Sequence, residues 1–305
     1  MPDSLLDQVN ILTSHFSRVV DLAIGTELPV TRIKALIDER LAALIKENFE
    51  GGVSDMVKYA VSGGKRLRGM LLVLTGLILK GRLETLVDPA AALELAHSAS
   101  LVHDDIIDNS AYRRGRPAFW KAYGLIMAVV IPHVMISLAL GILSSYGLKV
   151  LRKAIKSWER AALGQLIDTL IASGKPMGVK YDELAALKTG SVFEAACYIG
   201  AYLASKDHSL AESLGRYGLN LGVAYQVLDD LAGMSGSEED SGSLILLRKV
   251  KEGESMAKRL LKESINSALS SVKFLEDSEP FVELMRAVLT GFVVKSGLAS
   301  SLLPW

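Results

Sequence analysis

Apolar residues recur at helical spacing along almost the whole chain. Near its start, one apolar face predicts an amphipathic helix and is formed by Leu5, Val9, Leu12, Phe16, Val19 and Ala23. A second helix is predicted up to about Phe49, where Gly51-Gly52 follows, and its apolar face is formed by Ile33, Leu36, Ile37, Leu41 and Leu44. No stretch alternates apolar and polar residues over a useful strand length. The pattern predicts an all-α fold.

Glycine, proline and serine divide the rest of the chain into helix-sized pieces. These breaks lie at Gly63-Gly64, Gly81, Pro89, residues 174–178, 205–209 and 234–242, and Gly253. No break has the composition of a linker, and we find no internal repeat. We therefore expect one large helical bundle around a central cavity, a single domain over residues 1–305.

One long segment contains no acidic or basic residue. It runs from Ala122 to Leu148, which exceeds the roughly 20 apolar residues that cross a bilayer. Pro132, His133 and several serines interrupt it. A membrane-spanning helix is therefore an alternative, but a helix that is apolar on all sides is expected to pack inside a protein.

Charge and cysteine content narrow the classes of function. Lys+Arg and Asp+Glu both total 34, so the formal net charge is zero. Nucleic-acid binders usually carry a basic surplus, and we expect no nucleic-acid partner. Cys197 has no cysteine to pair with, and the first ten residues carry acids before any base, unlike a secretory signal. These features favour a cytoplasmic protein.

A cluster of three carboxylates ends one apolar helical run. Asp104 and Asp108 are one helical turn apart and Asp105 lies between them, so all three can face one cavity. Close oxygen ligands suit a hard cation such as Mg²⁺, which takes further ligands from water and substrate phosphate. Arg113 and Arg114 follow and offer planar donors to that phosphate. The alternative is a solvated acidic helix end with a basic turn.

A second acidic pair ends another apolar run. Asp229 and Asp230 follow Gln226 by about one turn. Two helices that end in acids can share a metal cluster across an apolar cavity. The two clusters together predict a cleft for a diphosphate with a hydrocarbon tail.

Basic residues mark the start of a predicted helix after Gly63-Gly64. Free N–H groups at such a start favour an anion, and Lys65 and Arg68, three residues apart, would face the same way. An ordinary basic helix start is the alternative.

Glu94-x-x-His97 has the spacing of a di-iron ligand pair, but no other histidine has a glutamate three residues before it, which disfavours a di-iron site.

Two further features concern histidine and glycine. His133 and His208 are interpreted as hydrogen-bonded core residues. Gly190 interrupts a helical run between Tyr181 and Ala204, and a kink there can turn Lys188 and Thr189 inward; a surface lysine at a helix break is the alternative. We find no nucleophile elbow, phosphate loop or dinucleotide-binding glycine pattern.

These motifs occur together, in the same order, in one family. The chain resembles the trans-isoprenyl diphosphate synthases, the polyprenyl synthetase family, from about Gly63 to Asp230. The matching pieces are GGKRLRG, ELAHSASLVHDDIID, RRGRP, GQLID, KTGSVFEAA and YQVLDD. The resemblance implies the isoprenoid synthase fold and a Mg²⁺-dependent enzyme that condenses isopentenyl diphosphate with an allylic diphosphate. It also implies a homodimer that meets at the uncharged helix, and a product that can pass to a membrane.

The resemblance implies a role for each group of site residues. The metal ligands would be Asp104, Asp105, Asp108, Asp229 and Asp230. Isopentenyl diphosphate would be held by Lys65, Arg68, His97 and Arg114. The allylic diphosphate would contact Arg113, Lys188, Thr189 and Gln226. In this family, aromatic residues above the first acids shorten the product, whereas this chain has Ala96, Ala99 and Ser100, which implies twenty carbons or more.

The chain also departs from the family pattern. Gly233 stands where a third acid is usual, Pro132-His133 replaces a glycine-aspartate pair, and Gly69 replaces a proline, which should loosen the turn. Arg248 and Lys249 substitute weakly for a glycine-lysine pair, and the end SLLPW lacks a basic tail. These losses keep open a weak or inactive partner subunit of a heteromeric synthase. A terpene cyclase is disfavoured, because it needs no second diphosphate site.

Overall fold

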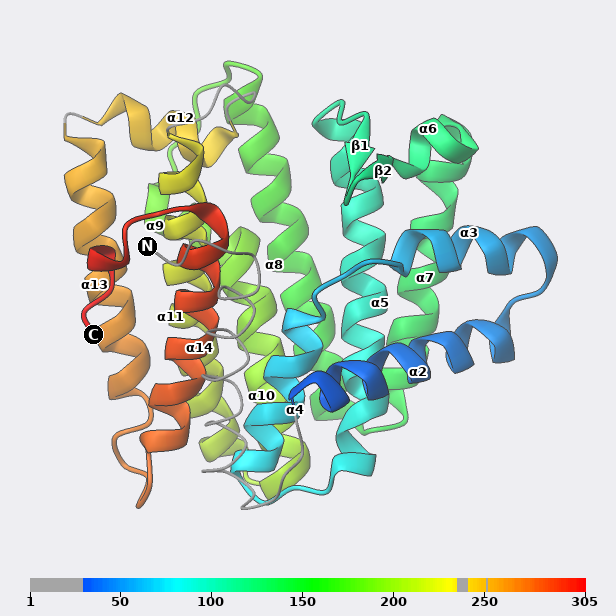
Figure 1. The fold of residues 1–305 in the computed structure, drawn as a ribbon, viewed down its shortest axis with the longest axis horizontal. Helices are drawn as coiled ribbons and strands as arrows, with labels where there is room; N and C mark the ends of the chain where they lie inside the picture. Colours follow the sequence, from blue (N-terminus) through cyan, green and yellow to red (C-terminus); the bar gives the residue numbers. More distant parts are fainter. Residues whose placement is uncertain (1–29, 235–240, 251) are drawn as a thin grey trace.

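The computed structural model describes residues 30–234, 241–250 and 252–305. Almost all ordered structure in this part is helical, so the predicted all-α class is confirmed (Figure 1). The α-helices are α2 (Val30–Asn48), α3 (Gly51–Val61), α4 (Leu67–Ile78), α5 (Leu83–Ile107), α6 (Phe119–Tyr123), α7 (Leu125–Ser144), α8 (Leu148–Ala172), α9 (Tyr181–Ala185), α10 (Ser191–Ser205), α11 (His208–Gly233), α12 (Gly242–Lys249), α13 (Gly253–Ser270) and α14 (Glu279–Ser296). A π-helix η1 (Ala186–Gly190), a short 3₁₀ helix η2 (Ser300–Leu302) and the strands β1 (Tyr112–Arg113) and β2 (Arg116–Pro117) complete the described elements.

Helix α10 lies in the middle of the bundle and packs on α4, α8 and α11. Its aromatic residues Phe193 and Tyr198 are almost completely buried. The backbones of α4 and α10 approach so closely that a Cβ on Gly200 would lie 2.2 Å from the Leu72 carbonyl oxygen. One contiguous cluster of buried apolar side chains extends from Val30 to Leu303.

Element boundaries match the sequence pattern except at one proline. Helix α2 ends one residue before Phe49, as expected. Pro89 was expected to break the chain, but it lies inside α5 with its ring buried in the core. Proline removes a single helical hydrogen bond, and core packing offsets that loss here. The helix predicted from Leu5 to Ala23 lies outside the described residues.

The short hairpin β1–β2 was too brief to show as an alternating pattern. Arg113 pairs with Arg116, and the two turn residues Arg114 (φ 55°) and Gly115 (φ 76°) are both left-handed. A two-residue hairpin loop needs this conformation, because its twist matches that of the strands. In Figure 1 the hairpin and α12 lie at the same end of the bundle. The C-terminal acids of α5 and α11 therefore lie at one end.

Helix α7 is the one helix in the described part of the chain that is long and apolar enough to cross a membrane. The mean hydropathy is 2.4, and only 28% of its most apolar 18-residue stretch is buried. Ala128, Met135 and Ala139 pack inward, while Ile126 is 74% exposed. In the single chain α7 packs on α5, α8 and α6, and the remaining part of its apolar surface is uncovered. Whether a second subunit covers it, as the resemblance implies, stays a prediction.

Candidate active site

The acids of the first cluster, at the end of α5, differ in their burial and their partners. Burial, with a smaller contribution from Asp108, raises the pKa of Asp104 to about 6, although the charges of Lys188 and Arg113 oppose the shift. Asp105 is 1% exposed and accepts a hydrogen bond of 2.5 Å from Arg113 Nε. All three acids act electrostatically on one another, and the assignment of all three to one metal site stays a prediction. Asp105 in addition positions the hairpin arginine.

The hairpin docks on the glycine turn that precedes α4. Arg114 Nη1 donates to the Ser62 carbonyl oxygen at 2.8 Å. Gly63 has a left-handed φ of 77°, and a Cβ on it would lie 3.4 Å from Arg114 Cδ. A Cβ on Gly64 would lie only 2.5 Å from Arg66 Nη1. The two glycines thus bring both arginines against the backbone at this turn.

Two carboxylates, the half-buried Asp38 and the buried Glu94, fix the first turn of α4. Arg66 is the left-handed residue before the helix, and its Nε donates to Asp38 at 2.6 Å. Glu94, 2% exposed, accepts from the Gly69 N–H at 2.8 Å. Proline at position 69 could not make this bond. The expectation that Gly69 loosens the turn is therefore wrong, because its N–H ties α4 to α5.

Arg68, in the first turn of α4, interacts electrostatically with acids of both clusters. Its guanidinium carbon is 5.7 Å from the Phe193 ring centre, and its buried Nε has no hydrogen-bond partner in the described part of the chain. Burial lowers its pKa, while Glu94, Asp104 and Asp229 act in the opposite direction. Arg68 is thus within electrostatic range of both acidic clusters. A buried donor without a partner indicates a site for an anionic ligand.

His97 lies within electrostatic range of Arg68, and Lys65 lies at the start of the same helix as Arg68. Burial, followed by the positive charges of Arg68 and Arg114, lowers the pKa of His97 well below its usual value, so the imidazole is neutral. Lys65 precedes α4, and burial together with the neighbouring Lys295 lowers its pKa to about 8. Arg68, His97 and Arg114 thus lie within electrostatic range of one another, while Lys65 interacts with Lys295 and Asp229.

The predicted kink at Gly190 is a π-helix. Element η1 carries Lys188 and Thr189, and Thr189 Oγ1 donates to Gln226 Oε1 at 2.5 Å. Helix α8 lies directly against it, since a Cβ on Gly164 would be 2.6 Å from Lys188 N. π-Helical turns are rare and frequently occur at functional sites. The interpretation that the break turns this lysine and hydroxyl inward is confirmed.

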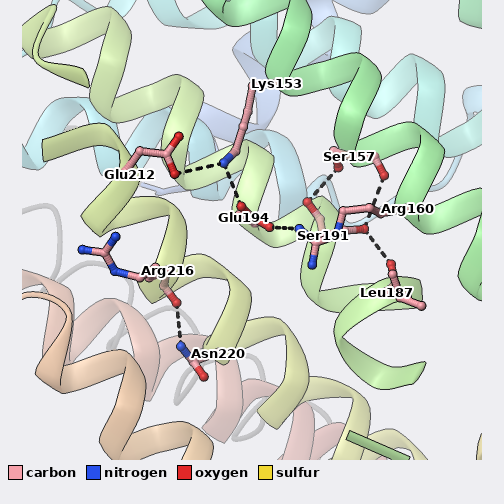
Figure 2. Close-up of polar contacts among 9 residues, drawn as sticks. All are labelled: Lys153, Ser157, Arg160, Leu187, Ser191, Glu194, Glu212, Arg216 and Asn220. Atoms are coloured by element: carbon pink, nitrogen blue, oxygen red, sulfur yellow. Dashed lines mark hydrogen bonds and ion pairs between the residues drawn. The ribbon is translucent and has the colours of Figure 1, made fainter. Parts of the chain in front are cut away.

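Polar contacts between α8 and α10 hold the π-helix in place (Figure 2). Ser191 Oγ donates to the Leu187 carbonyl oxygen at 2.6 Å, and Ser157 Oγ donates to the Ser191 carbonyl oxygen at 2.7 Å. Close by, Glu194 accepts from Lys153 at 2.7 Å and also from Arg160. These contacts fix the position of the junction at which η1 ends and α10 begins.

Asp168 of α8 sets the position of Lys188. Lys188 Nζ lies 2.8 Å from Asp168 Oδ2. Burial alone would lower the pKa of Lys188, but the Asp168 carboxylate raises it above its usual value. The Ser243 N–H at the start of α12 donates to the other Asp168 oxygen at 2.8 Å. A Cβ on Gly242 would lie 2.2 Å from the Asp168 carbonyl oxygen, so α12 can approach this closely only with glycine there.

Asp229 and Asp230, the second acidic pair, differ in their exposure and in their partners. Asp229 is exposed, whereas Asp230 is 5% exposed. Asp230 accepts from Tyr181 Oη at 2.7 Å and from Ser243 Oγ at 2.9 Å. Burial nevertheless raises its pKa to about 6. Of the two acids, Asp229 is thus the one that is exposed to solvent, and Asp230 joins α11 to α9 and α12.

Sequence reasoning missed Asp168, Tyr181 and Ser243 as site residues. Asp168 could have been found, because it ends the GQLID piece that resembles the family. Tyr181 and Ser243 lie in segments with no motif, and only the fold brings them to Asp230.

The acids facing the cleft fit a hard divalent cation. In the described ranges no group of three acidic, histidine or cysteine side chains forms a ready-made metal site. Asp104 and Asp108 nevertheless place two oxygen donors on one side, and Asp108 adds to the rise in the Asp104 pKa. A cation would relieve that repulsion. Mg²⁺ typically uses one or two carboxylates and completes its shell with water and phosphate, which suits this arrangement.

Comparison with known proteins agrees with this geometry. The family model for polyprenyl synthetase matches residues 51–245. The chain is 34% identical over 230 residues to hexaprenyl pyrophosphate synthase of Saccharolobus solfataricus, and the match covers 75% of each protein. The chain belongs to the polyprenyl synthetase family. It is an enzyme of isoprenoid synthesis, a transferase of prenyl groups.

Other relatives of this polyprenyl synthetase support the assignment. It is 31% identical over 249 residues to geranylgeranyl diphosphate synthase of Methanosarcina mazei, which covers 79% of this chain and 70% of the relative. The solved geranyltranstransferase of Thermotoga maritima is similar with a TM-score of 0.75 and 27% identity, over 87% of this chain and 98% of that one. The isoprenoid synthase fold is therefore shown.

The structure shows the surroundings of two positions at which this chain differs from the family pattern. A Cβ on Gly233 would lie 3.4 Å from Leu244 Cδ2, so α12 packs against the position of the missing third acid. His133 is exposed and its ring lies 5.8 Å from that of His103, and His208 is exposed and hydrogen-bonded to Tyr198. The interpretation of His133 and His208 as core residues is wrong, because both lie on the outer sides of their helices.

Proposed function

We propose that this polyprenyl synthetase condenses isopentenyl diphosphate with an allylic diphosphate and acts as a single domain in the cytoplasm. One observation carries the proposal: Arg68 lies within electrostatic range of Asp104 and Asp229, and its buried Nε has no hydrogen-bond partner among the described residues. The basic side chains therefore suit a diphosphate that binds to them directly. The acidic side chains suit a second diphosphate that binds through a metal ion. A condensation of two diphosphates needs both.

The allylic substrate would bind on the acidic side. Asp104, Asp108 and Asp229 would hold Mg²⁺, which when bound supplies positive charge to the leaving diphosphate. Lys188, oriented by Asp168, lies within electrostatic range of Asp104 and Asp108 and would bind the same diphosphate. Gln226, fixed by Thr189, would add a hydrogen bond, and Arg113 is held close by through Asp105.

The second substrate would bind on the basic side. Arg68, Lys65 and Arg114 would neutralise the diphosphate of isopentenyl diphosphate, and neutral His97 could donate a hydrogen bond to it. The chain thus holds the double bond of one substrate beside the reacting carbon of the other. Asp105 and Asp230 act as positioning residues.

Bond changes in this reaction balance without a nucleophilic side chain. The allylic C–O bond breaks with its electron pair leaving on diphosphate. The double bond of isopentenyl diphosphate attacks the allylic carbon and forms the new C–C bond. A proton is then lost to the released diphosphate, which restores a double bond. Apolar walls such as Phe193 protect the cation from water.

Small residues precede Asp104 on α5, which supports a long product. Ser100 is one turn before Asp104 and, like Ala96, is half-buried, whereas Ala99 is completely buried in the core. No aromatic residue on this side of α5 blocks growth of a chain. We therefore propose a trans-polyprenyl diphosphate of twenty carbons or more, which can pass to a membrane.

The exposed side of α7 supports a homodimer. Ile126, Val129 and Val130 are at least 45% exposed on one apolar surface. A large exposed apolar patch commonly marks a protein interface, and two copies related by a two-fold axis would cover it.

An elongation assay tests the proposed function. The purified chain is incubated with Mg²⁺, labelled isopentenyl diphosphate and, separately, dimethylallyl, farnesyl or geranylgeranyl diphosphate, and the extracted prenols are sized. We expect elongation of at least one primer. Absence of elongation with every primer, from a folded protein, would contradict the proposal and favour a partner subunit. Cyclic hydrocarbons without incorporated label would favour a cyclase.

A further inference from the structure

Ser191 lies at the junction between η1 and α10 and is completely buried. In an α-helix each backbone N–H donates to the carbonyl four residues earlier, which for Ser191 is that of Leu187. Here the Ser191 N–H donates to the Ala186 carbonyl instead, five residues earlier, as in a π-helix. The Ser191 hydroxyl donates to the Leu187 carbonyl oxygen at 2.6 Å. The hydroxyl thus takes the place that the N–H has left.

This bond of Ser191 differs from an ordinary serine contact within a helix. Ser205, at the other end of α10, makes the same kind of bond to the Ala201 carbonyl oxygen at 2.8 Å. The helix is regular there, so that carbonyl also accepts a backbone N–H and the serine adds a second donor. At Leu187 the hydroxyl replaces the α-helical donor. Its loss would therefore favour the return of the Ser191 N–H to Leu187, and with it an α-helical turn.

Helix α8 supports the π-helical form from outside (Figure 2). Ser157 Oγ donates to the Ser191 carbonyl oxygen at 2.7 Å. Gly164 lets the α8 backbone approach η1, since a Cβ there would lie 2.6 Å from Lys188 N, and Asp168 pairs with Lys188 Nζ. Ser157, Gly164 and Asp168 are seven and four residues apart and so lie on one side of α8. This side of α8 fits η1 while Lys188 keeps its present direction.

We propose that the Ser191 hydroxyl keeps η1 π-helical and thereby positions Lys188 and Thr189 for the allylic substrate. The inference rests on the proposed function, which places Lys188 and Gln226, the partner of Thr189, at the allylic diphosphate. Return to an α-helical turn would shift the register of η1 against α10 by about one residue, or about 100°. Lys188 would then turn away from Asp168, and Thr189 from Gln226. Ser191 is a positioning residue, because it acts through these two side chains.

Steady-state kinetics with Mg²⁺ and a primer that the wild type elongates test this role. Ser191→Ala should raise the KM for the primer about tenfold or more, as for loss of one hydrogen bond to a charged group. The KM for isopentenyl diphosphate should not change, because its predicted ligands lie on or beside α4, α5 and the hairpin. Ser191→Thr, which keeps the hydroxyl, should restore most of the primer affinity.

Two further variants complete the kinetic test. Ser205→Ala removes the ordinary serine bond of the same helix and should leave both KM values unchanged. Ser191→Cys keeps the shape of the side chain with a weaker donor, so it should raise the primer KM by less than Ser191→Ala. Should Ser191→Ala not fold, a wild-type primer KM for Ser191→Cys would overturn the inference. Equal rises in KM for both substrates would also overturn it.

Crystal structures without substrates keep this inference distinct from the proposed function. In Ser191→Ala the residue 191 N–H should bond to the Leu187 carbonyl, and Lys188 should no longer pair with Asp168. A π-helix and an ion pair that both persist in Ser191→Ala would overturn the inference. If the helix changes as expected but the wild type elongates no primer, the role of Ser191 in placing Lys188 stands and the proposed function fails. If elongation is normal and Ser191→Ala behaves like the wild type, only the role of Ser191 fails.

Discussion

Lys188 Nζ lies 2.8 Å from Asp168 Oδ2, and this ion pair joins α8 to the π-helix beside Asp104 and Asp108. Asp168 is 4% exposed and also accepts the Ser243 N–H. The lysine is therefore held in one direction by a carboxylate that is itself fixed. A flexible lysine on a regular helix would lack this orientation.

Asp168→Asn should impair the allylic side of the site. The variant leaves Lys188 without its partner, and we expect destabilisation of about 2 kcal/mol, less than the roughly 3–5 kcal/mol of fully buried pairs, because the Lys188 side chain is 26% exposed. The KM for the allylic substrate should rise while that for isopentenyl diphosphate stays constant. Chemical denaturation and steady-state kinetics measure both effects. The double variant Asp168→Asn/Lys188→Met should be more stable than Asp168→Asn alone, because no charge is left unpaired. If the two substitutions instead lower the free energy of unfolding additively, the Asp168–Lys188 ion pair does not contribute to stability.

Affinity for Mg²⁺ should depend on pH through Asp104. Its pKa of about 6 in the metal-free chain means that the carboxyl is protonated below pH 6 and ionised above it. A cation must displace that proton, so apparent Mg²⁺ affinity should be constant above about pH 7 and fall by about tenfold per pH unit below pH 6. Titrations of metal at pH 5 to 8 test this. Asp55→Asn on the surface should leave the profile unchanged, and a flat profile for the wild type would contradict the assignment.

Tyr181→Phe should destabilise the fold more at neutral than at acidic pH. Asp230 has a pKa raised to about 6 against 3.8, so its burial opposes folding increasingly as pH rises from about 4 to 6, and fully above that. Tyr181 donates to the ionised carboxylate, and its loss should cost about 1–3 kcal/mol at pH 7.5 and less at pH 5.

Denaturation at both pH values checks the Tyr181 prediction. Tyr112→Phe, at a residue that is 74% exposed, is the matched control and should lie within about 0.5 kcal/mol of the wild type. Equal losses for Tyr181→Phe at the two pH values would contradict the ionised state of Asp230.

Ser100→Phe should shorten the product. Ser100 is half-buried one turn before Asp104, so an aromatic ring there would enter the space below the acids. Ala99 is completely buried, and enlarging it would overpack the core instead. Chromatography of the prenols should show a shift of at least one isoprene unit. Ser270→Phe at the exposed end of α13 should leave the product distribution unchanged. If Ser100→Phe makes the same products as the wild type, the residue that limits product length lies elsewhere.

Replacing Val130 with aspartate should separate a dimer. Val130 is 50% exposed on the apolar side of α7, and a charge there would be buried in an interface between copies. Sedimentation velocity should show a dimer for the wild type and a monomer for Val130→Asp. Val250→Asp, at a residue that is 41% exposed and lies outside α7, should remain dimeric. A monomeric wild type would contradict the proposed interface.

Helical periodicity was sufficient to predict the fold class, because one apolar face per helix specifies a bundle. It could not predict which helices are covered. Helix α7 is apolar all round, and sequence alone does not reveal that α5, α8 and α6 leave part of its surface uncovered in the single chain. Pro89 was misinterpreted for the related reason that core packing overrides a local helix breaker.

Motif spacing located the cleft but not the direction of each acid. Asp105 binds Arg113, eight residues further along the same motif, whereas Asp230 binds partners from other parts of the fold. The partners of Asp230, Tyr181 and Ser243, are 49 and 13 residues away in sequence. Contacts of that kind depend on helix packing, so a short motif cannot encode them.

Metal-dependent elongation by Asp104→Asn tests the central claim most directly. Asp104 is assigned to the metal on the allylic diphosphate, and the substitution keeps its shape while removing its charge. We predict that the wild type extends an allylic primer with Mg²⁺ and not with EDTA, and that Asp104→Asn loses about a hundredfold or more in kcat with its circular dichroism and Tm retained. Near-normal turnover by a folded Asp104→Asn protein, or wild-type elongation in EDTA, would contradict the account.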